Sequence, residues 1–456
     1  MIMNTHRYIA RFIVEAETPL FVGSGESSLL KDALLQTDSN GLPMILGTSL
    51  AGVLRHSLLG NTWIEQVFGY AEGDKGCGSL LKVSSAYMMI SETEVSEGII
   101  EKIDDKVLNK FTNLPSRQHV RITEKGVAAD KGLFDNEVVY KGTRFVFELE
   151  LKGNSEDKTY WNSILEQVNN PTFRIGSGTR NGYGSLKVIA VYSQVFDLQN
   201  EKDFESYINF NPSFNADINW NDAKPSELTS DKFTKYSLKL KPDSFFIFSE
   251  GFGDDEADNR PLDEEIVVYK NGEIDFEHQT VIPASSIKGA ISHRVAFHYN
   301  RLTQQFADFG GGKTGFDNEA VATLFGKAGQ DNKEKVVDAQ AGLVFINDFY
   351  FSDEQVNNKK ILNHVAIDRF TGGAMDGALF SEKVSNLLGN EFKFDVFVQY
   401  NTEDEILKSL ESALVDICKG LLPLGGMTTK GHGMFTGKLL KNGKEIFNYD
   451  NKEVLC

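Results

Sequence analysis

The chain has 456 residues, more than a single hydrophobic core usually serves, so two domains are expected. Its composition, 41% hydrophobic and 25% charged with 33 Phe, is that of a globular protein and excludes a disordered, collagen-like or disulfide-stapled chain. The formal net charge of −18 by itself argues against nucleic acid as a partner, because long-range steering toward phosphates would be repulsive.

The cysteines and the apolar runs indicate the compartment. Cys77, Cys418 and Cys456 lie far apart and form no CxxC pair, so neither a disulfide framework nor a cysteine-based zinc site is indicated. The N-terminal residues alternate polar and apolar side chains, and no run approaches the roughly 18 apolar residues of a membrane span. We therefore expect a cytoplasmic protein without a membrane partner.

The first part of the chain opens with an alternating stretch, YIARFIVEA at 8–16, which predicts a half-buried strand. After the loop PLFVGSG (19–25), the phrase GTSLAGVL begins at Gly47, and its apolar residues recur at the spacing of an amphipathic helix. Ser49 lies near the expected N-cap of that helix. The strand TRFVFELEL (143–151) follows, so this part alternates strand, helix and strand in an α+β pattern.

Two further stretches of the first part are polar and carry cations. HVRITEKGVAADKGLF (119–134) lies between well-patterned strands and predicts a β-hairpin arm that protrudes from its domain, with an ordinary solvated hairpin as the alternative. IGSGTRNGYG (175–184) predicts a flexible glycine-rich loop around Arg180. A basic residue among glycines favours a backbone that approaches a polyanion.

The same stretches recur, in the same order, in the second part of the chain, which predicts a duplicated module. The later copies are FFIFSEG (245–251), VIPASSIKGAI (281–291), TLFGKA (323–328, matching QVFGYA at 66–71), HVAIDRFTGGAMDGALF (364–380) and LGGMTTKGHG (424–433). The stretch 209–232 is rich in Asn, Asp, Ser and Pro and lacks periodicity. We therefore predict a first domain at 1–208, a linker at 209–232 and a second domain at 233–456.

This ordered set of motifs resembles the RAMP superfamily of CRISPR-associated proteins over nearly the whole chain. More narrowly, it resembles the backbone ("Cas seven") subunit of type III effector complexes, here in two fused copies, as in a type III-D-like system. The resemblance implies two tandem RRM-like, ferredoxin-like domains of the α+β class, each with a projecting β-hairpin thumb, stacked along a guide RNA. Such domains bind single-stranded RNA by backbone contact, stacking and shape, while the guide selects the target by base pairing. The acidic net charge is then tolerable, because only local cations are needed.

The resemblance implies RNA contacts at the helix starts, the arms and the glycine-rich loops. These residues are Gly47, Ser49, Arg55, Arg121, Lys125, Gly176, Arg180, Gly182, Ser285, Ser286, Lys288, Arg369, Gly425, Gly426, Lys430 and Gly431. A helix N-terminus that follows small residues offers backbone N–H groups to a phosphate. A tight strand-to-helix turn that permits close packing is the alternative interpretation.

Backbone subunits of type III complexes cut target RNA with an aspartate in the loop before the helix start, and the resemblance assigns this role to Asp32, with Asp38 following. A carboxylate there can accept the 2′-hydroxyl proton or hold Mg²⁺ or Mn²⁺ at the scissile phosphate, and no organic cofactor is expected. Counting back nine residues from Gly272, as from Gly41, makes Asp263 the second catalytic candidate. Lesser candidates in the second copy are Asp254, Asp255 and Asp258, and the recurring histidines His119, His364 and His432 are more typical of stacking or hydrogen bonding.

The leading prediction is therefore an endoribonuclease subunit of a CRISPR ribonucleoprotein. Its partners would be guide crRNA, target RNA and other effector subunits of the RAMP and large-subunit types. Two alternatives stay open: a non-catalytic RNA-binding scaffold of the same kind of complex, and a guide-processing endoribonuclease that acts alone.

Overall fold

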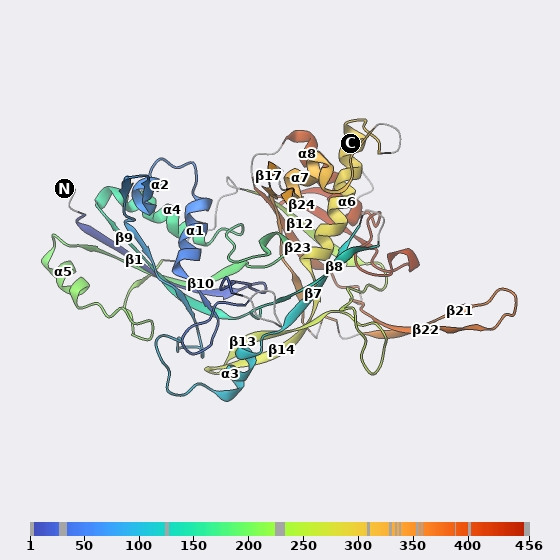
Figure 1. Ribbon diagram of the computed structural model, residues 1–456, viewed down its shortest axis with the longest axis horizontal. Coiled ribbons are helices and arrows are strands. Elements are labelled where there is room, and N and C mark those ends of the chain that lie inside the picture. The colour runs from blue at the N-terminus through green and yellow to red at the C-terminus, as the bar shows by residue number, and fades with distance from the viewer. Residues whose placement is uncertain are drawn as a thin grey trace.

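The computed structural model shows two α+β modules joined along one side (Figure 1). It describes residues 4–26, 34–123, 127–223, 233–307, 311–327, 331–332, 335–336, 339–352, 355–356, 359–387, 389–399 and 403–450. None of the described helices is long and apolar enough to cross a lipid bilayer.

The first module is built around an antiparallel sheet with the order β11-β10-β1-β9-β6-β2, and β5 also pairs with β9. Its strands are β1 (His6–Ala16), β2 (Met44–Ile45), β5 (Leu81–Val83), β6 (Ala86–Met88), β9 (Arg144–Gly153), β10 (Leu186–Asp197) and β11 (Asn221–Asp222). Its helices are α1 (Gly47–Ser57), α2 (Ile64–Phe68), α3 (Asp105–Thr112), α4 (Lys158–Val168) and α5 (Glu201–Ile208), and β3 (Tyr70–Glu72) pairs with β4 (Lys75–Cys77).

The second module repeats this arrangement with the order β19-β23-β12-β24-β25. Its strands are β12 (Phe233–Pro242), β19 (Val344–Ile346), β23 (Phe392–Gln399), β24 (Phe435–Lys441) and β25 (Lys444–Asn448), and its helices are α6 (Ala284–Leu302), α7 (Glu319–Phe325) and α8 (Asp404–Cys418). Short pairs join β15 (Gly326–Lys327) to β18 (Gln340–Ala341) and β16 (Asp331–Asn332) to β17 (Lys335–Val336). In both modules the first strand lies between the third and the last, as in a ferredoxin-like β-α-β-β-α-β unit.

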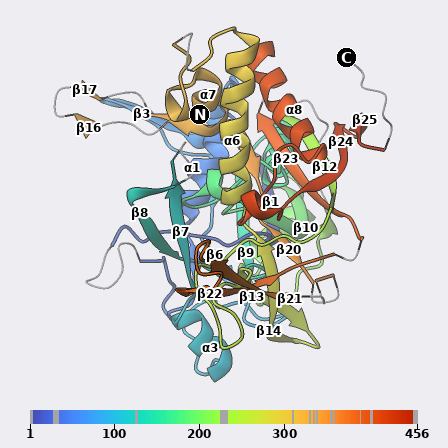
Figure 2. The same ribbon diagram turned by 90° about the vertical axis from the view of Figure 1, so that its right-hand side faces the viewer.

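The period-two pattern of the first strand explains where its core lies. Tyr8, Ala10, Phe12 and Val14 are buried on the helix-covered face, where Phe12 stacks on Phe147 at 5.0 Å between ring centroids. In the second module Tyr236, Leu238 and Leu240 are fully buried beneath α6 and α8 in the same way (Figure 2). The predicted tandem fold is thus confirmed, because core residues recur at every second position of the first strand in each module.

Each module carries a hairpin thumb. The first thumb consists of β7 (Ser116–Ile122) and β8 (Ala128–Glu137), and the second of β21 (Lys360–Ile367) and β22 (Ala374–Val384). The second thumb projects far from the body of the protein, whereas the first lies between the two modules (Figure 1).

A long hairpin from the second half of the chain packs against the first module. It is formed by β13 (Asp263–Lys270) and β14 (Glu273–Ile282), and β20 (Phe349–Phe351) pairs with its second strand. Val267 and Ile274 of this hairpin are buried in the hydrophobic core of the first module, and the Val267 N–H donates to the carbonyl of Lys141 at 2.8 Å. The two modules therefore share a core instead of only touching.

Most of the predicted linker lies on the surface of the first module. The segment 209–223, which we call the strap, crosses the face of the sheet opposite α1 and α4: Arg11 donates to the carbonyl of Ser213 at 3.0 Å, and β11 pairs with β10. Residues 224–232 lie outside the described residues, so the boundary between 1–208 and 233–456 stays a prediction.

The contact surface between the modules, here called the junction, holds a buried ion-pair network. Arg117 of the first thumb donates to Glu264 at 2.5 Å and to Asp348 at 2.6 Å, and its side chain is 4% exposed. Asp348 is fully buried and also accepts the first N–H of α6, from Ala284, at 2.7 Å. One guanidinium therefore ties the first thumb to the helix start of the second module.

We expect Arg117→Met to destabilise the protein strongly, because Glu264 and Asp348 would lose the cation that they share at the junction. The free energy of unfolding, measured by urea denaturation, should fall by roughly 3–5 kcal/mol. The matched control is Lys106→Met, which removes an ion pair with Asp275 in which both side chains are more than half exposed, and which should change little. Equal losses from both variants would contradict a structural role for the network.

Candidate nucleic-acid interface

A groove of about 1750 Å³ runs between the first thumb and the second module. One wall is the thumb, with Arg121 and Phe134. The other wall is the start of α6, with Ser285 and Ser286, and the glycine-rich loop 424–433. The groove brings together six of the residues predicted to contact RNA: Arg121, Ser285, Ser286, Lys288, Gly425 and Gly426.

The remaining predicted residues lie elsewhere. Gly47, Ser49 and Arg55 belong to α1, and Arg369 is exposed at the tip of the second thumb. Gly176, Gly182 and Arg180 lie in the loop 175–184, and Lys430 and Gly431 are exposed in the loop 424–433. Lys125 and Asp32 lie outside the described residues.

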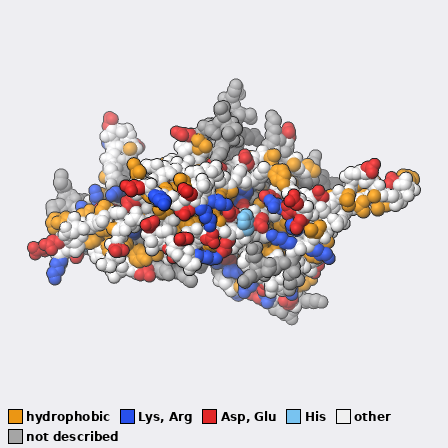
Figure 3. Space-filling model, turned by 90° about the horizontal axis from the view of Figure 1, so that it is seen from below, with side chains coloured by type: hydrophobic (Ala, Val, Ile, Leu, Met, Phe, Trp, Pro, Cys, Tyr) orange, Lys and Arg blue, Asp and Glu red, His pale blue; other side chains and the backbone are white. Residues whose placement is uncertain are grey.

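Charges on the groove are mixed. Its lining includes the cations Arg117, Arg121, Lys141, Lys288 and Lys327 and the acids Glu250, Asp263, Glu264, Glu265 and Asp317. The lower face of the protein likewise shows Lys and Arg interspersed with Asp and Glu instead of one basic patch (Figure 3). Any polyanion held here would therefore contact cations one at a time.

The two glycine-rich loops have the same backbone. The Ser177 N–H donates to the Phe21 carbonyl at 2.8 Å, and the Gly426 N–H donates to the Ile247 carbonyl at 2.8 Å. Gly176 and Gly425 both have positive φ, and a Cβ on either would lie 2.1 or 2.4 Å from that same carbonyl oxygen. These glycines are thus required by close packing of the chain on itself.

The shared geometry aligns the two loops residue by residue. Because Gly182 corresponds to Gly431 at the end of each loop, Arg180 corresponds to Thr429, and Lys430 corresponds to Asn181. Arg180 and Lys430 are therefore not the same residue in two copies.

Arg180 packs at the junction. Its guanidinium lies 3.8 Å from the ring centroid of Phe345 and donates through Nε to the Gly342 carbonyl at 2.6 Å. Burial lowers its pKa to about 10. The predicted RNA contact is not what this geometry supports, because the cation already binds the second module.

At both helix starts, a backbone N–H group already donates a hydrogen bond to a side chain of the protein. The Gly47 N–H donates to the Ser85 hydroxyl at 3.2 Å, and the Ala284 N–H donates to Asp348. Beside the second start, Lys288 donates to the Asn181 side chain at 3.1 Å, and burial together with the neighbouring Arg180 lowers the pKa of Lys288 to about 8. The lysine remains a groove cation below that pH.

The loops that precede the two helix starts indicate that Asp258, and not the predicted Asp263, is the counterpart of Asp32. The Ser24 N–H donates to the Leu34 carbonyl at 2.8 Å, and the Glu250 N–H donates to the Arg260 carbonyl at 3.1 Å. Gly23 forms an isolated β-bridge with Leu35, and Ser249 forms the equivalent β-bridge with Pro261. The ends of the segments 23–35 and 249–261 are thus equivalent, and because the two segments have the same length, Asp32 aligns with Asp258 in sequence.

The register contradicts the predicted equivalence of Asp32 and Asp263. Asp263 is the first residue of β13, pairs with Thr280, and lies 3.4 Å from both Lys359 Nζ and His278 Nδ1. Counting back from the glycines failed because the β13–β14 hairpin lengthens the chain between the loop and the helix start. Asp38 accepts the N–H groups of Asn40 and Leu42 and so serves a turn.

Asp258 is held against the base of the second thumb. Its Oδ2 accepts the backbone N–H of Ser381 at 2.7 Å and the Ser381 hydroxyl at 2.9 Å. These bonds lower the pKa of Asp258, so it is ionised at neutral pH. Lys383 on the same strand binds Asp254 at 2.9 Å and Glu256 at 2.5 Å, which fixes the rest of the loop.

Histidines tie each thumb to its glycine-rich loop. In the second module the Nε2 atoms of His364 and His432 lie 2.8 and 2.9 Å from Oε1 of the fully buried Glu382. In the first module His119 Nε2 lies 2.5 Å from the hydroxyl of Tyr183, and the imidazole stacks on Phe134. Tyr183 and Glu382 were not predicted from the sequence, although the motifs GYG and GHG place a ring at the same point of both loops.

Among the described residues no group of three or more His, Cys, Asp or Glu side chains is arranged to hold a metal ion. The acids around Asp258 are instead engaged with Lys383 and Ser381. The described part of the chain thus does not fit a protein-built cage for Mg²⁺ or Mn²⁺, and the predicted cation stays a prediction.

The pKa of His119 generates a pH prediction. Burial and the nearby Arg117 lower this pKa from 6.5 to about 4, so the folded protein keeps the ring neutral where the unfolded chain protonates it. Stability from this site is present above pH 6.5 and is lost as the pH falls toward 4. We expect urea unfolding of His119→Gln to be less pH-dependent than that of the wild type over this range. An unchanged pH dependence would contradict a neutral His119.

Comparison with known proteins agrees with the duplicated architecture. The sequence matches the RAMP superfamily over residues 13–187 and again over 274–436. No curated protein sequence matches the chain. Among solved structures, a chain of the type III-B Cmr-beta complex, determined by cryo-EM in the apo state, is 18% identical with a TM-score of 0.30, and the match covers 40% of this chain and 96% of that one. Because the two family matches span well over half of its residues, one in each module, the chain belongs to the RAMP superfamily.

Proposed function

We propose that this protein is a fused backbone subunit of a type III CRISPR ribonucleoprotein that binds guide crRNA and cuts complementary target RNA in the cytoplasm. The observation that carries the proposal is the repetition of one RAMP module, with the thumb of the first module forming a single groove with the helix start and glycine-rich loop of the second. Its other partners would be effector subunits of the RAMP and large-subunit types.

In this proposal, guide RNA runs along the thumbs and loops and not across the sheets. The sheet face of the second module opposite α6 and α8 carries Phe233, Phe345 and Phe397, and Arg174 and Arg180 of the first module lie over Phe345. That face, on which RRM domains usually stack bases, is therefore closed. Ser285, Ser286, Gly425 and Lys288 would contact phosphates in the groove, and Phe134 offers a ring on which a base can stack.

Target cleavage would take place beside Asp32 and Asp258. The 2′-oxygen of the target ribose forms a bond to the adjacent phosphorus while the bond to the 5′-oxygen breaks. The carboxylate accepts the 2′-hydroxyl proton, and water protonates the leaving 5′-oxygen. Because an aspartate whose pKa is lowered is a weak base, most of the rate must come from holding the 2′-oxygen in line with the leaving group. A divalent cation, if used, would depend on RNA phosphates for most of its ligands.

We expect the reconstituted complex to lose one cleavage product with Asp32→Ala and a different one with Asp258→Ala, since each carboxylate serves its own module. Asp263→Ala should leave the product pattern unchanged. Denaturing gels of end-labelled target RNA measure the products, and filter binding checks that target binding is intact. Asp255→Ala, an exposed acid of the same loop, is the matched control.

An unchanged pattern with both Asp32→Ala and Asp258→Ala would reject the catalytic proposal and leave the scaffold function. Cleavage of repeat-containing RNA by the purified chain alone would instead support the guide-processing alternative.

We expect Lys288→Met to weaken crRNA binding and to lower the slope of log affinity against log salt by about 0.7, the value for one phosphate contact on a single strand. Wild-type affinity should also fall as the pH rises above about 8, because Lys288 then loses its proton, and the variant should lack this step. Lys327→Met, at another point of the groove, should lower the salt slope while keeping the pH step. A pH step retained in Lys288→Met would contradict the assignment.

A further inference from the structure

At the junction the second module receives arginine side chains of the first. Arg174 donates to the Ile346 carbonyl at 3.3 Å and to the Asn347 side chain at 2.5 Å, and its guanidinium lies 5.1 Å from the ring centroid of Phe345. Arg180 lies over the same ring, and Arg117 binds Asp348. The receiving positions are the end of β19 and the turn that follows it.

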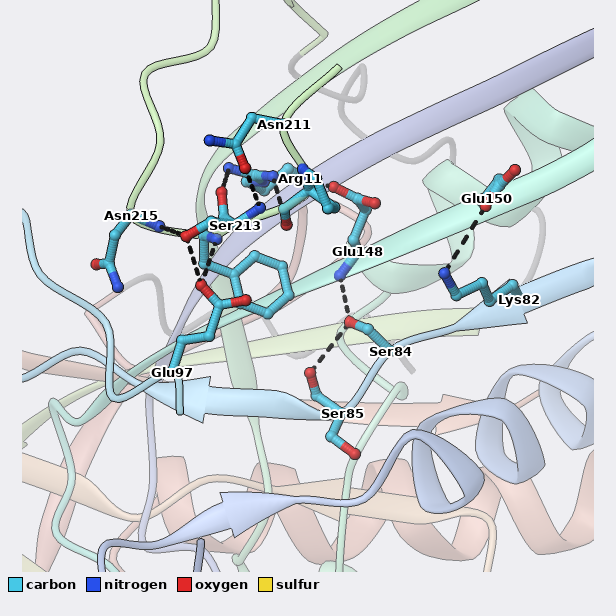
Figure 4. Close-up of polar contacts among 12 residues, drawn as sticks. Arg11, Lys82, Ser84, Ser85, Glu97, Glu148, Glu150, Asn211, Ser213 and Asn215 are labelled. Carbon is cyan, nitrogen blue, oxygen red and sulfur yellow. Dashed lines mark hydrogen bonds and ion pairs between the residues drawn. The ribbon is translucent and has the colours of Figure 1, made fainter. Parts of the chain in front are cut away.

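Among the residues that the structure describes, no thumb or glycine-rich loop of the second module contacts the same positions of the first module. The strand pairs of the two modules show which positions match. Lys82 pairs with Glu150 in the first module where Phe345 pairs with Phe397 in the second. Likewise, Met44 pairs with Tyr87 where Val281 pairs with Tyr350. Lys82, Ser84 and Ser85 are therefore the counterparts of Phe345, Asn347 and Asp348. They line a separate cavity of about 210 Å³, which we call the socket (Figure 4).

Three carboxylates give the socket its charge. Glu97, Glu148 and Glu150 line it together with Lys82, the serines 84 and 85, Tyr87, Pro212 and Phe214. Glu148 accepts from Arg11 at 3.2 Å, and Glu150 accepts from the Tyr207 hydroxyl at 3.0 Å. The side chains of Glu148 and Glu150 are 13% and 14% exposed.

The strap builds the wall of the socket. Glu97 Oε2 accepts the Ser213 hydroxyl at 2.7 Å and the Phe214 N–H at 2.8 Å, and Figure 4 shows this carboxylate beneath the strap. Its other oxygen has no hydrogen-bond partner among the residues that the structure describes. Arg11 is 4% exposed and lies over the rings of Phe210, Phe214 and Trp220, which fixes the strap from the other side.

We propose that the socket receives an arginine side chain of a neighbouring protein subunit, as the second module receives Arg174 and Arg180. A planar guanidinium has the donors to bind two carboxylates and the serine hydroxyls at once. A guanidinium fits this lining better than an RNA phosphate does, because three carboxylates face the socket while Arg7 and Arg11, which pair with two of them, are not among its lining residues. The inference depends on the proposed function only for the nature of the neighbour, an effector subunit.

The neighbour differs from a second copy of this chain. At the positions of Arg117, Arg174 and Arg180, the second module carries Leu362, Pro423 and Thr429, as the registers of the thumbs and glycine-rich loops show. The end of one copy therefore lacks the arginines that the socket of another copy would need. Head-to-tail growth of this chain alone is disfavoured by the same replacement.

The first test places a photo-crosslinking p-benzoylphenylalanine at Lys82 in the complex assembled from its native subunits. After irradiation, mass spectrometry should identify an arginine-containing peptide of a different subunit. A crosslink to RNA, or to residues 360–436 of a second copy, would overturn the proposal. The control position is Glu65, an exposed residue of α2 away from the socket, which should give no such crosslink.

The second test is Glu150→Gln, which keeps the shape of the side chain and its bond to Tyr207. Dissociation of the crosslinked neighbour, measured by surface plasmon resonance, should be at least about 10-fold faster, because truncating one partner of a buried charge pair acts mainly on dissociation. Glu65→Gln should change nothing, and thermal unfolding checks that both variants fold. Unchanged dissociation would refute the socket. If Glu150→Gln weakens subunit binding but the wild-type complex cuts no RNA, the proposed function is refuted and the socket proposal is still supported.

Discussion

The buried ion pair between Arg117 and Asp348 is the constraint on which the arrangement of the two modules depends. The arginine comes from the first thumb, and the aspartate caps the start of α6 in the second module, so one interaction sets the thumb against the helix. Glu264 on the β13–β14 hairpin binds the same guanidinium, so this hairpin is joined to the network as well. Because an unpaired charge in this site would be costly, the thumb, the helix start and the hairpin are held together or not at all.

The groove is a consequence of that constraint. With Arg117 fixed, the rest of the first thumb lies along Ser285, Ser286 and the second glycine-rich loop, and the polar groups of two modules line one channel. Among the described residues the second thumb has no such partner, and it extends from the body (Figure 1). The chain thus contains one complete thumb-to-module contact, together with an unmatched thumb at one end and a socket at the other.

The two modules have the same backbone conformation in their equivalent loops, but they differ in the side chains at their ends. The loops 175–184 and 424–433 have matching hydrogen bonds, yet the residues that meet a neighbour have diverged from Arg174 and Arg180 to Pro423 and Thr429. The sheet face opposite the core helices differs between the modules in the same way: the first module has the charged pair Lys82 and Glu150 where the second has the rings of Phe345 and Phe397. Backbone geometry is shared because glycines and buried apolar residues determine it, whereas each exposed end is free to match a different partner.

The sequence by itself determined the duplicated α+β module, because strand alternation, helical spacing and glycine positions are local patterns that survive duplication. It also located the segments that line the groove. It did not reveal that Arg180 binds Phe345, that Asp258 and not Asp263 corresponds to Asp32, or that the strap closes a sheet face. Those features were decided by the tertiary structure alone, since each depends on contacts between residues far apart in the chain and on an inserted hairpin whose length counting along the sequence does not take into account.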